Sequence, residues 1–368
     1  MQVRPYQSLY VHVPFCAAKC AYCAFYSKIP QSSEIQNYLS RLEIEFAQKQ
    51  AQCQELRSIF IGGGTPSILD AAQLQSLFSL IRKYFRLIDD CEFSMEANPD
   101  SLTVDKLQAA KAHGLNRLSL GVQSFNPKIR ETIGRQGKLD RLEEILSAAQ
   151  AMQLHDINFD LIYNIPGQSL QDWQNDLRRA CAYAPTHLSA YALILEEKSA
   201  LASKFNQEND EQYFEAFWQS CDEILSEYGF SRYEIANFAK PSYQCRHNQE
   251  VWHGQTYLGC GPAAASFDGM NRCSNPANLE NWLQGAKPEI DQISPEARAR
   301  EILAFAMRTC AGWNKEEFTA LTGYTAEELR KDEIEHLTGL GLIINNDKYM
   351  YPTPKGLLFN DYILEMMI

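Results

Sequence analysis

The sequence lacks any long hydrophobic run, and it has no excess of positive charge. No stretch of its 368 residues approaches the roughly 18 consecutive apolar residues of a membrane-spanning helix. Lys and Arg number 34 against 46 Asp and Glu, a net charge of −12. Wrapping a nucleic-acid backbone needs clustered cations, and binding an anionic membrane surface needs them too. We therefore expect no nucleic-acid partner and at most indirect membrane contact.

An export signal is also missing. The amino terminus, MQVRPYQSLYVHVPF, has no long apolar segment followed by a small-residue cleavage site, so a cytoplasmic location is expected. The chain holds 11 cysteines, an odd number. A complete disulfide framework is therefore disfavoured, and reduced thiols with metal or catalytic use for some of them are favoured.

Short apolar, β-prone segments alternate with helical patterns between residues 9 and 195. This alternation is typical of parallel βα units, which form either an open doubly wound sheet or a partial βα barrel. The expected strands are Leu9–Val13, Ser58–Ile61, Glu92–Met95, Arg117–Val122, Asn158–Ile162 and Leu188–Leu195.

Special residues fall where these expected strands end. A cysteine cluster, 16–23, follows the first strand, and a glycine-rich segment, 62–66, follows the second. Glu96, Gln123 and Asp160 stand near the ends of the next three strands. Because binding residues gather at the carboxyl ends of parallel strands, we expect one site there.

The pattern changes in the second half of the chain. Residues 239–275 are irregular and dense in Cys, His, Trp, Tyr and Gly, and the tail, 290–368, has a helix–turn–ribbon pattern similar to a winged helix. We expect a core domain over 1–238 and a smaller C-terminal domain over 239–368. Acidic residues around the would-be recognition helix do not support DNA binding.

The clearest chemical signal is Cys16, Cys20 and Cys23, spaced C-x3-C-x2-C. A closed zinc site wants four protein ligands in tetrahedral geometry, and His12, within the expected first strand, is the candidate fourth ligand. Three thiolates on a short loop suit instead a [4Fe–4S] cluster whose fourth iron stays open to a small chelating ligand. A zinc-stabilised binding module remains the alternative.

The triplet directly after a first strand, with Tyr22 before its last cysteine, resembles the radical S-adenosylmethionine (SAM) superfamily. Within it, five ordered segments resemble the oxygen-independent coproporphyrinogen III oxidases and their haem-chaperone relatives: 9–16, 60–67, 96–99, 117–124 and 160–168. The resemblance implies an α/β fold, a partial (β/α)6 radical SAM barrel with a smaller, winged-helix-like C-terminal domain.

The resemblance also implies which residues bind cofactors. Cys16, Cys20 and Cys23 would hold the [4Fe–4S] cluster, and SAM would chelate its open iron, with a separate electron donor for the cluster. Glycine lets the backbone approach a ligand closely, and carboxylate, amide and guanidinium groups can hold the polar parts of SAM. The implied SAM-contacting residues are Tyr10, Tyr22, Gly63, Gly64, Thr65, Glu96, Gln123, Arg135 and Asp160.

Two departures favour the chaperone branch over the oxidases. The oxidase branch has the pattern C-x3-C-x2-C-x-C, and in this chain Phe25 stands at the position of the fourth cysteine. The oxidases also carry an extension ahead of the triplet, and here 15 residues precede Cys16. Ala24, however, stands where the chaperones usually have an acidic residue.

A second segment resembles the haem-binding stretch of the chaperones, H-N-x-x-[YW]-W. His247, Asn248 and Trp252 match it, and Val251 stands where Tyr is usual. Haem iron takes an axial His or Cys thiolate between flat apolar side chains, so His247, Cys245 and Trp252 are the candidate haem residues, with the axial ligand left open between the first two. The alternative is a structural loop that caps the barrel.

The resemblance therefore implies a haem chaperone that binds haem, a [4Fe–4S] cluster and SAM, and passes haem to acceptor proteins. One alternative is an oxygen-independent coproporphyrinogen III oxidase, which decarboxylates its substrate oxidatively to protoporphyrinogen IX. Another is a radical SAM enzyme that acts on a different tetrapyrrole.

Overall fold

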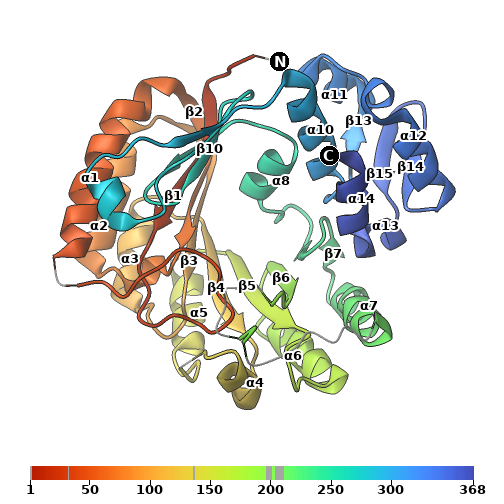
Figure 1. Cartoon of the computed structure of the whole chain (residues 1–368). Helices are drawn as coiled ribbons and strands as arrows, with labels where there is room; N and C mark the ends of the chain where they lie inside the picture. The colour runs from red at the N-terminus through yellow and green to blue at the C-terminus, as the bar shows by residue number, and fades with distance from the viewer. Residues whose placement is uncertain (1, 32, 136, 196–200, 204–210) are drawn as a thin grey trace.

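The structure is a computed structural model that describes residues 2–31, 33–135, 137–195, 201–203 and 211–368. Its centre is a curved sheet of six parallel strands with helices on the convex side (Figure 1). The strands are β1 (Tyr6–Val13), β2 (Cys53–Gly63), β3 (Leu87–Ala97), β4 (Arg117–Gln123), β5 (Asp156–Tyr163) and β6 (His187–Ala192). This arrangement confirms the α/β fold with a partial βα barrel.

The helices that cover the barrel follow each strand in turn. They are α1 (Glu34–Lys49), α2 (Ala71–Tyr84), α3 (Val104–Ala112), α4 (Pro127–Thr132), α5 (Leu142–Ala151) and α6 (Leu170–Ala182), with short 3-10 turns η1 (Gln50–Gln52) and η2 (Pro66–Ile68). Asp70 and Ser169 begin α2 and α6 with complete capping boxes, in which side chain and backbone exchange hydrogen bonds.

The two faces of the barrel strands differ in polarity because successive side chains point to opposite sides of a strand. Outward residues such as Val11, Ile59 and Leu120 are fully buried beneath the helices. Inward residues form polar contacts instead: Ser58 donates to Ser8 across 2.9 Å, and Asn158 donates to the hydroxyls of neighbouring strands. The barrel thus encloses a polar interior.

The sheet continues beyond the six core strands on both sides. Beyond β6 lie β8 (Asn237–Ala239) and β7 (Ser231–Arg232), and α7 (Glu211–Glu227) packs on α6. On the other side β9 (Tyr257–Cys260) pairs in parallel with β1 and is followed by β10 (Ala265–Phe267), β11 (Arg272–Ser274) and β12 (Glu289–Asp291).

The boundary predicted at residue 238 therefore does not coincide with an edge of the sheet. Residues 257–291, predicted within the C-terminal domain, supply four strands to the barrel sheet, because β9 finds its hydrogen-bonding partner in β1. The segment 239–275 also contains α8 (Arg246–Trp252), which lies on the concave side of the sheet beside the C-terminal domain (Figure 1).

The tail has a separate hydrophobic core, which includes Leu303, Phe318 and Leu337. Helix α10 (Pro295–Ala306), strand β13 (Trp313–Asn314), helices α11 (Lys315–Thr322) and α12 (Ala326–Gly339), and strands β14 (Ile343–Asn345) and β15 (Tyr349–Pro352) follow in the order of a winged helix. The remaining helices are α9 (Leu279–Leu283), α13 (Pro354–Leu358) and α14 (Asn360–Met367). No helix in the described part of the chain is both long and apolar enough to cross a membrane.

Candidate cofactor site

The cysteine triplet lies on a loop that leaves the carboxyl end of β1. The loop is closed at its base, because the backbone nitrogen of Cys16 donates to the carbonyl of Lys28 at 3.0 Å and that of Lys28 donates to Pro14 at 2.8 Å. The nitrogen of Cys23 donates to the carbonyl of Cys20 at 3.3 Å. The three thiols are free and half-buried, so the loop presents them together at one end of the barrel.

Each of the first two thiols has a polar neighbour from another part of the chain. The Cys16 Sγ lies 3.4 Å from the Thr65 hydroxyl, and Arg135 donates to the Cys20 Sγ at 3.6 Å. Burial raises the pKa of the Cys23 thiol, and the nearby thiols of Cys20 and Cys16 raise it further. Within the described residues, no three His, Cys, Asp or Glu side chains converge tightly enough to hold a single metal ion.

The glycine run after β2 fits closely against its neighbours. A Cβ at Gly64 would lie 2.6 Å from the carbonyl oxygen of Phe15, and a Cβ at Gly62 would lie 2.8 Å from the Glu96 carboxylate. Gly63 has a φ of +104°, a conformation that favours glycine. The backbone of this segment therefore approaches both the cysteine loop and the carboxylate of β3.

Two carboxylates face each other across the carboxyl ends of the strands. Glu96 accepts a hydrogen bond from the backbone nitrogen of Gly63 at 3.1 Å. Burial first, and then the negative charge of Asp160, raise its pKa to about 8. Burial also raises the pKa of Asp160, although donors from Ser119 and Asn158 oppose that shift. Because two close carboxylates cannot both ionise easily, one of them keeps its proton at neutral pH.

Gln123 is the last residue of β4, and Arg135 contacts the end of that strand from the loop after α4. Gln123 has a φ of +69°, an uncommon conformation outside glycine that is concentrated at functional sites. Arg135 donates to the carbonyl of Gly121 at 2.8 Å, and its buried Nε has no hydrogen-bond partner. A carboxylate or sulfur-bearing ligand could supply that partner.

The tyrosines complete the set. Tyr22 lies among Cys20, Cys23, Arg135 and Asp160, whose charges all act on its hydroxyl, and burial raises its pKa. The Tyr10 hydroxyl lies 3.1 Å from the Nδ1 of His12. The structure thus gathers the predicted cluster and SAM residues at the carboxyl ends of β1 to β5. Three thiols, a glycine segment without side chains, and an orphaned guanidinium N–H have the chemistry that a cluster with a bound amino-acid ligand requires.

Comparisons with known proteins agree with this geometry. Residues 10–180 match the radical SAM superfamily, and residues 293–359 match the HemN C-terminal domain. The protein named "Heme chaperone HemW" from Bacillus subtilis is 31% identical over 97% of this chain and 98% of its own length. Those of Escherichia coli (31% identical, 99% and 98%) and Buchnera aphidicola (36% identical, 98% and 98%) carry the same name. The chain belongs to the HemW family of the radical SAM superfamily.

The solved structure of E. coli coproporphyrinogen III oxidase (HemN) has the same fold. It superimposes with a TM-score of 0.87 over 99% of this chain and 90% of its own, at 24% sequence identity. Membership of the radical SAM superfamily implies a [4Fe–4S] cluster and SAM as cofactors of this HemW-family chain.

The predicted haem residues do not lie beside the cysteines. Cys245 precedes α8 and His247 lies in its first turn, and α8 packs on the middle of β2. The partner of His247 there is Ser58, five residues before Gly63 on β2. At about 3.3 Å per strand residue, Ser58 is roughly 16 Å from Gly63. Trp252 ends α8 on the side of the C-terminal domain.

His247 is held by contacts inside the barrel. Its Nδ1 lies 3.0 Å from the Ser58 hydroxyl, and its ring packs on Phe60 with centroids 5.3 Å apart. Phe60 in turn stacks on Tyr10 at 6.4 Å. Burial lowers the pKa of His247 to about 4, so its ring is neutral at pH 7. A row of three rings therefore connects the cofactor end of the barrel with α8.

A polar network at the amino ends of the strands was missed by the sequence analysis. Arg117 forms an ion pair of 2.5 Å with Asp156. His187 contacts Asn158 at 2.6 Å and the Tyr233 hydroxyl at 2.8 Å. Arg117, Asp156 and His187 each begin a strand, and that shared position is the signal that could have revealed them. They lie at the end of the strands away from the cysteines.

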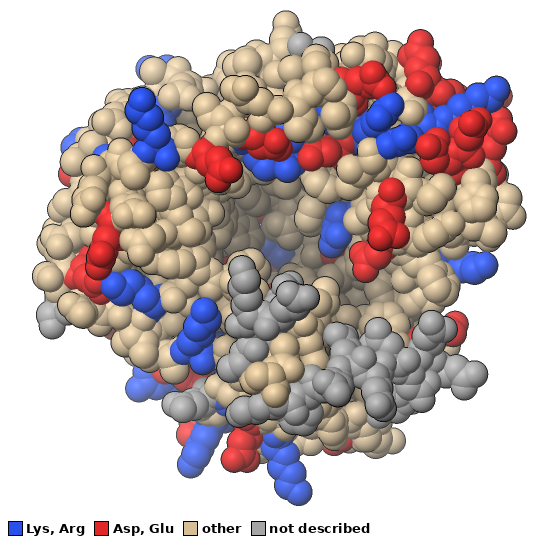
Figure 2. All heavy atoms as spheres, in the orientation of Figure 1, with Lys and Arg blue, Asp and Glu red and all other residues tan. Residues whose placement is uncertain are grey.

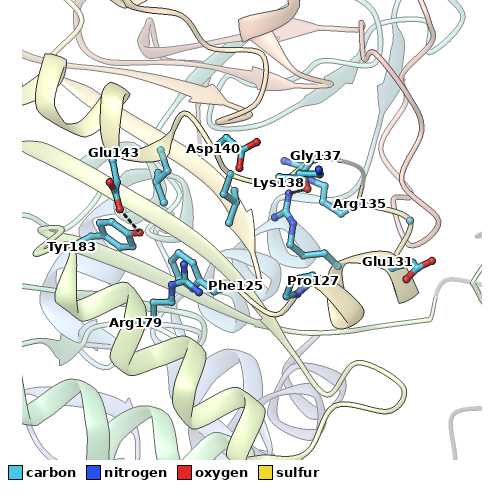
Figure 3. Close-up of a pocket in the computed structure, with 14 residues that line it drawn as sticks. Phe125, Pro127, Glu131, Arg135, Gly137, Lys138, Asp140, Glu143, Arg179 and Tyr183 are labelled. Carbon is cyan, nitrogen blue, oxygen red and sulfur yellow. Dashed lines mark hydrogen bonds between the residues drawn. The ribbon is translucent and has the colours of Figure 1, made fainter.

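A pocket of about 940 Å³ opens beside α4, α5 and α6, outside the barrel (Figure 3). Arg179 lies over the ring of Phe125 at 5.0 Å, and the Tyr183 hydroxyl donates to Glu143 at 3.5 Å. Arg135 contributes to its wall and also contacts Cys20. The pocket mixes charges of both signs, so its lining alone indicates no particular ligand.

Proposed function

We propose that this chain binds haem and passes it to an acceptor protein, while holding a [4Fe–4S] cluster and SAM. The observation that carries the proposal is its similarity, over nearly the full length of both chains, to proteins named heme chaperones. Position 25, where the pattern of the oxidase branch has a fourth cysteine, is an exposed phenylalanine in this chain. An electron donor for the cluster and a haem-accepting protein are the partners this function requires.

For the cofactors, we assign the cluster to Cys16, Cys20 and Cys23. A reduced cluster can supply an electron to the sulfonium of SAM. The Gly63–Thr65 backbone would admit the ligand closely, Arg135 would offer its unbonded Nε–H to an anionic group, and Glu96 would accept or donate a hydrogen bond according to its protonation. The further SAM contacts assigned are Tyr10, Tyr22, Gln123 and Asp160.

For haem, we assign His247 as the axial ligand. Metal ligation needs a neutral imidazole or a thiolate. The lowered pKa of His247 keeps its ring neutral, whereas burial strongly raises the pKa of the Cys245 thiol, which stays protonated at pH 7. Cys245 is therefore the weaker candidate, and Trp252 supplies a flat apolar surface at the other end of α8.

The test is a haem titration of anaerobically reconstituted protein, followed by absorbance. We expect His247→Ala to bind haem at least about tenfold more weakly than wild type, because one coordinate bond is lost. His155→Ala, a change at an exposed histidine outside α8, serves as control and should bind like wild type. Equal affinity of wild type and His247→Ala would overturn the axial assignment.

The same preparation distinguishes a chaperone from an oxidase. Wild-type protein is incubated anaerobically with coproporphyrinogen III, SAM and a reductant, and the porphyrins are separated after oxidation. We expect the substrate to remain. Accumulation of protoporphyrinogen IX would overturn the chaperone proposal and support the oxidase.

A further inference from the structure

Two hydrogen-bond donors at the junction of α8 and the C-terminal domain have no acceptor. The indole Nε1 of Trp252 and the Nε of Arg308 are both buried and unbonded. The Arg308 guanidinium lies over the Trp252 ring, 4.6 Å from its centroid. Among the described residues, no side-chain hydrogen bond or ion pair of Arg308 is present. A guanidinium and an indole are therefore stacked on each other, and the Nε–H of one and the Nε1–H of the other have no hydrogen-bond acceptor.

The carboxylate whose charge acts on Arg308, that of Glu234, already accepts hydrogen bonds. Glu234 is 1% exposed, and it accepts hydrogen bonds from the backbone nitrogen of Ala236 at 3.0 Å and from the Asn237 side chain. Its charge acts on Arg308 from a distance, without an ion pair between them. Glu234 thus leaves the donors of Arg308 free while making the surroundings favourable for a cation.

The place is also open to a ligand. Helix α8 ends at Trp252, and His253 ties that end to the C-terminal domain by hydrogen bonding to the Gly312 carbonyl at 3.0 Å and packing on Trp313. Figure 2 shows that the molecule is hollowed at its centre, where α8 lies in Figure 1, and that Lys or Arg side chains are visible inside the hollow. Trp252 and Arg308 are each only partly buried, so their environment borders solvent.

Buried N–H groups without acceptors cost free energy, and such unsatisfied groups call for a missing partner. A guanidinium presents a fork of donors that matches a carboxylate, and an indole offers one donor and no acceptor. We propose that Arg308 and Trp252 form a binding site for a ligand carboxylate. This inference rests on the proposed function: the carboxylate that this site binds is a propionate of haem, and haem is the ligand that α8 would hold through His247.

The test compares haem with its dimethyl ester, in which both propionates lose their charge. Both are titrated into cluster-loaded wild type, Arg308→Gln, Trp252→Phe and the control Arg179→Gln, which removes another arginine stacked on an aromatic ring but remote from α8. A hydrogen bond to a charged group corresponds to about tenfold or more in affinity. We expect the ester to bind to wild type and to Arg179→Gln more weakly than free haem does, by that factor.

In Arg308→Gln, free haem should bind as weakly as the ester does, and the ester should bind as it does to wild type. Trp252→Phe keeps the ring and removes the N–H, so it should lose part of the preference for the free acid. The wild-type comparison needs no variant and holds even where Arg308→Gln fails to fold.

Three outcomes would overturn the site. Equal wild-type affinity for haem and its ester overturns it and leaves the proposed function standing. An ester effect of the same size in Arg308→Gln as in wild type shows that the propionates are recognised elsewhere and overturns it too. Binding of neither porphyrin overturns the proposed function, and the site with it.

Discussion

The carboxylate of Glu92, on β3, accepts a hydrogen bond from the backbone nitrogen of His247 at 3.0 Å. The Cys245 thiol donates to the same oxygen at 3.5 Å, and the other oxygen accepts from the backbone nitrogen of Arg246 at 2.7 Å. One strand residue thus satisfies the first free N–H groups of α8, the donors that every helix leaves unpaired at its start. An acidic group there also interacts favourably with the helix dipole.

We therefore predict that Glu92→Gln loosens α8. Glutamine has one acceptor oxygen where glutamate has two, so at least one backbone N–H loses its partner, at a cost of about 1–3 kcal/mol. Hydrogen exchange of the α8 amides should become faster, and the free energy of unfolding should fall. Asp90→Asn is the matched control, because Asp90 pairs with Arg246 at 3.0 Å but is 75% exposed, and exposed pairs contribute about 0–1 kcal/mol. Unchanged exchange in Glu92→Gln would show that α8 is held by its other contacts.

The glycine segment gives a prediction about packing. In Gly64→Ala, the new Cβ would meet backbone atoms of Val13 and Phe15, at 2.6 to 2.9 Å, and backbone cannot move aside as a side chain can. Overpacking of this kind costs about 1–3 kcal/mol, so the free energy of unfolding measured with denaturant should fall by that amount. In Gly339→Ala, at the end of α12, no atom lies within 4 Å of the new Cβ, and the change should be neutral or slightly stabilising. Equal effects of the two changes would contradict the close approach at Gly64.

The cofactor end of the barrel could be predicted from sequence because its residues follow strands directly. Cys16, Gly63, Glu96 and Gln123 each stand at or just after the carboxyl end of a parallel strand, and parallel strands bring those ends together. The parallel α/β class followed from the same alternation of strands and helices, which fits an open sheet as well as a partial barrel, and the family resemblance implied the barrel.

The position of α8 could not be found in this way. The contacts of His247 are with Ser58 and Glu92, far away in sequence, and no local pattern specifies which strands a distant helix will meet. The pairing of β9 with β1 likewise joins segments that are far apart in sequence, and no local pattern predicts it. The polar interior does have a signal in the sequence, because Asp156, Asn158 and Asp160 alternate with apolar residues along β5.

The raised pKa of Glu96 predicts a pH dependence of stability in the cofactor-free protein. In the folded chain the pKa of this carboxyl is about 8, against an ordinary value of 4.5. Between these values the unfolded chain releases the proton and the folded chain retains it, so the free energy of unfolding falls as pH rises, by up to about 1.4 kcal/mol per pH unit. Below pH 4.5 both states hold the proton, and above about 8 the loss is complete.

Glu96→Gln removes this titration while keeping a neutral side chain of the same shape. The stability of the variant relative to wild type should therefore increase from pH 5 to pH 8, measured by denaturant unfolding at several pH values. Glu144→Gln, a change at an exposed carboxylate on α5, controls for the altered net charge. A difference between Glu96→Gln and wild type that stays constant over this pH range would refute the raised pKa.

The cysteine triplet predicts which thiols carry iron. After anaerobic reconstitution, Cys20→Ser should lose the broad iron–sulfur absorption and most of the bound iron, because a hydroxyl is a poor replacement for a thiolate in a cluster. Cys273→Ser is the matched control: its thiol is also free and half-buried, but it lies on β11, away from the triplet. Iron content and absorption should be those of wild type. Zinc without iron in the wild-type protein would contradict the cluster, and iron retained by Cys20→Ser would remove Cys20 from the ligand set. The Cys20 thiol lies beside Arg135, so an Arg135→Gln variant that keeps its iron would separate a role in SAM binding from a role in holding the cluster.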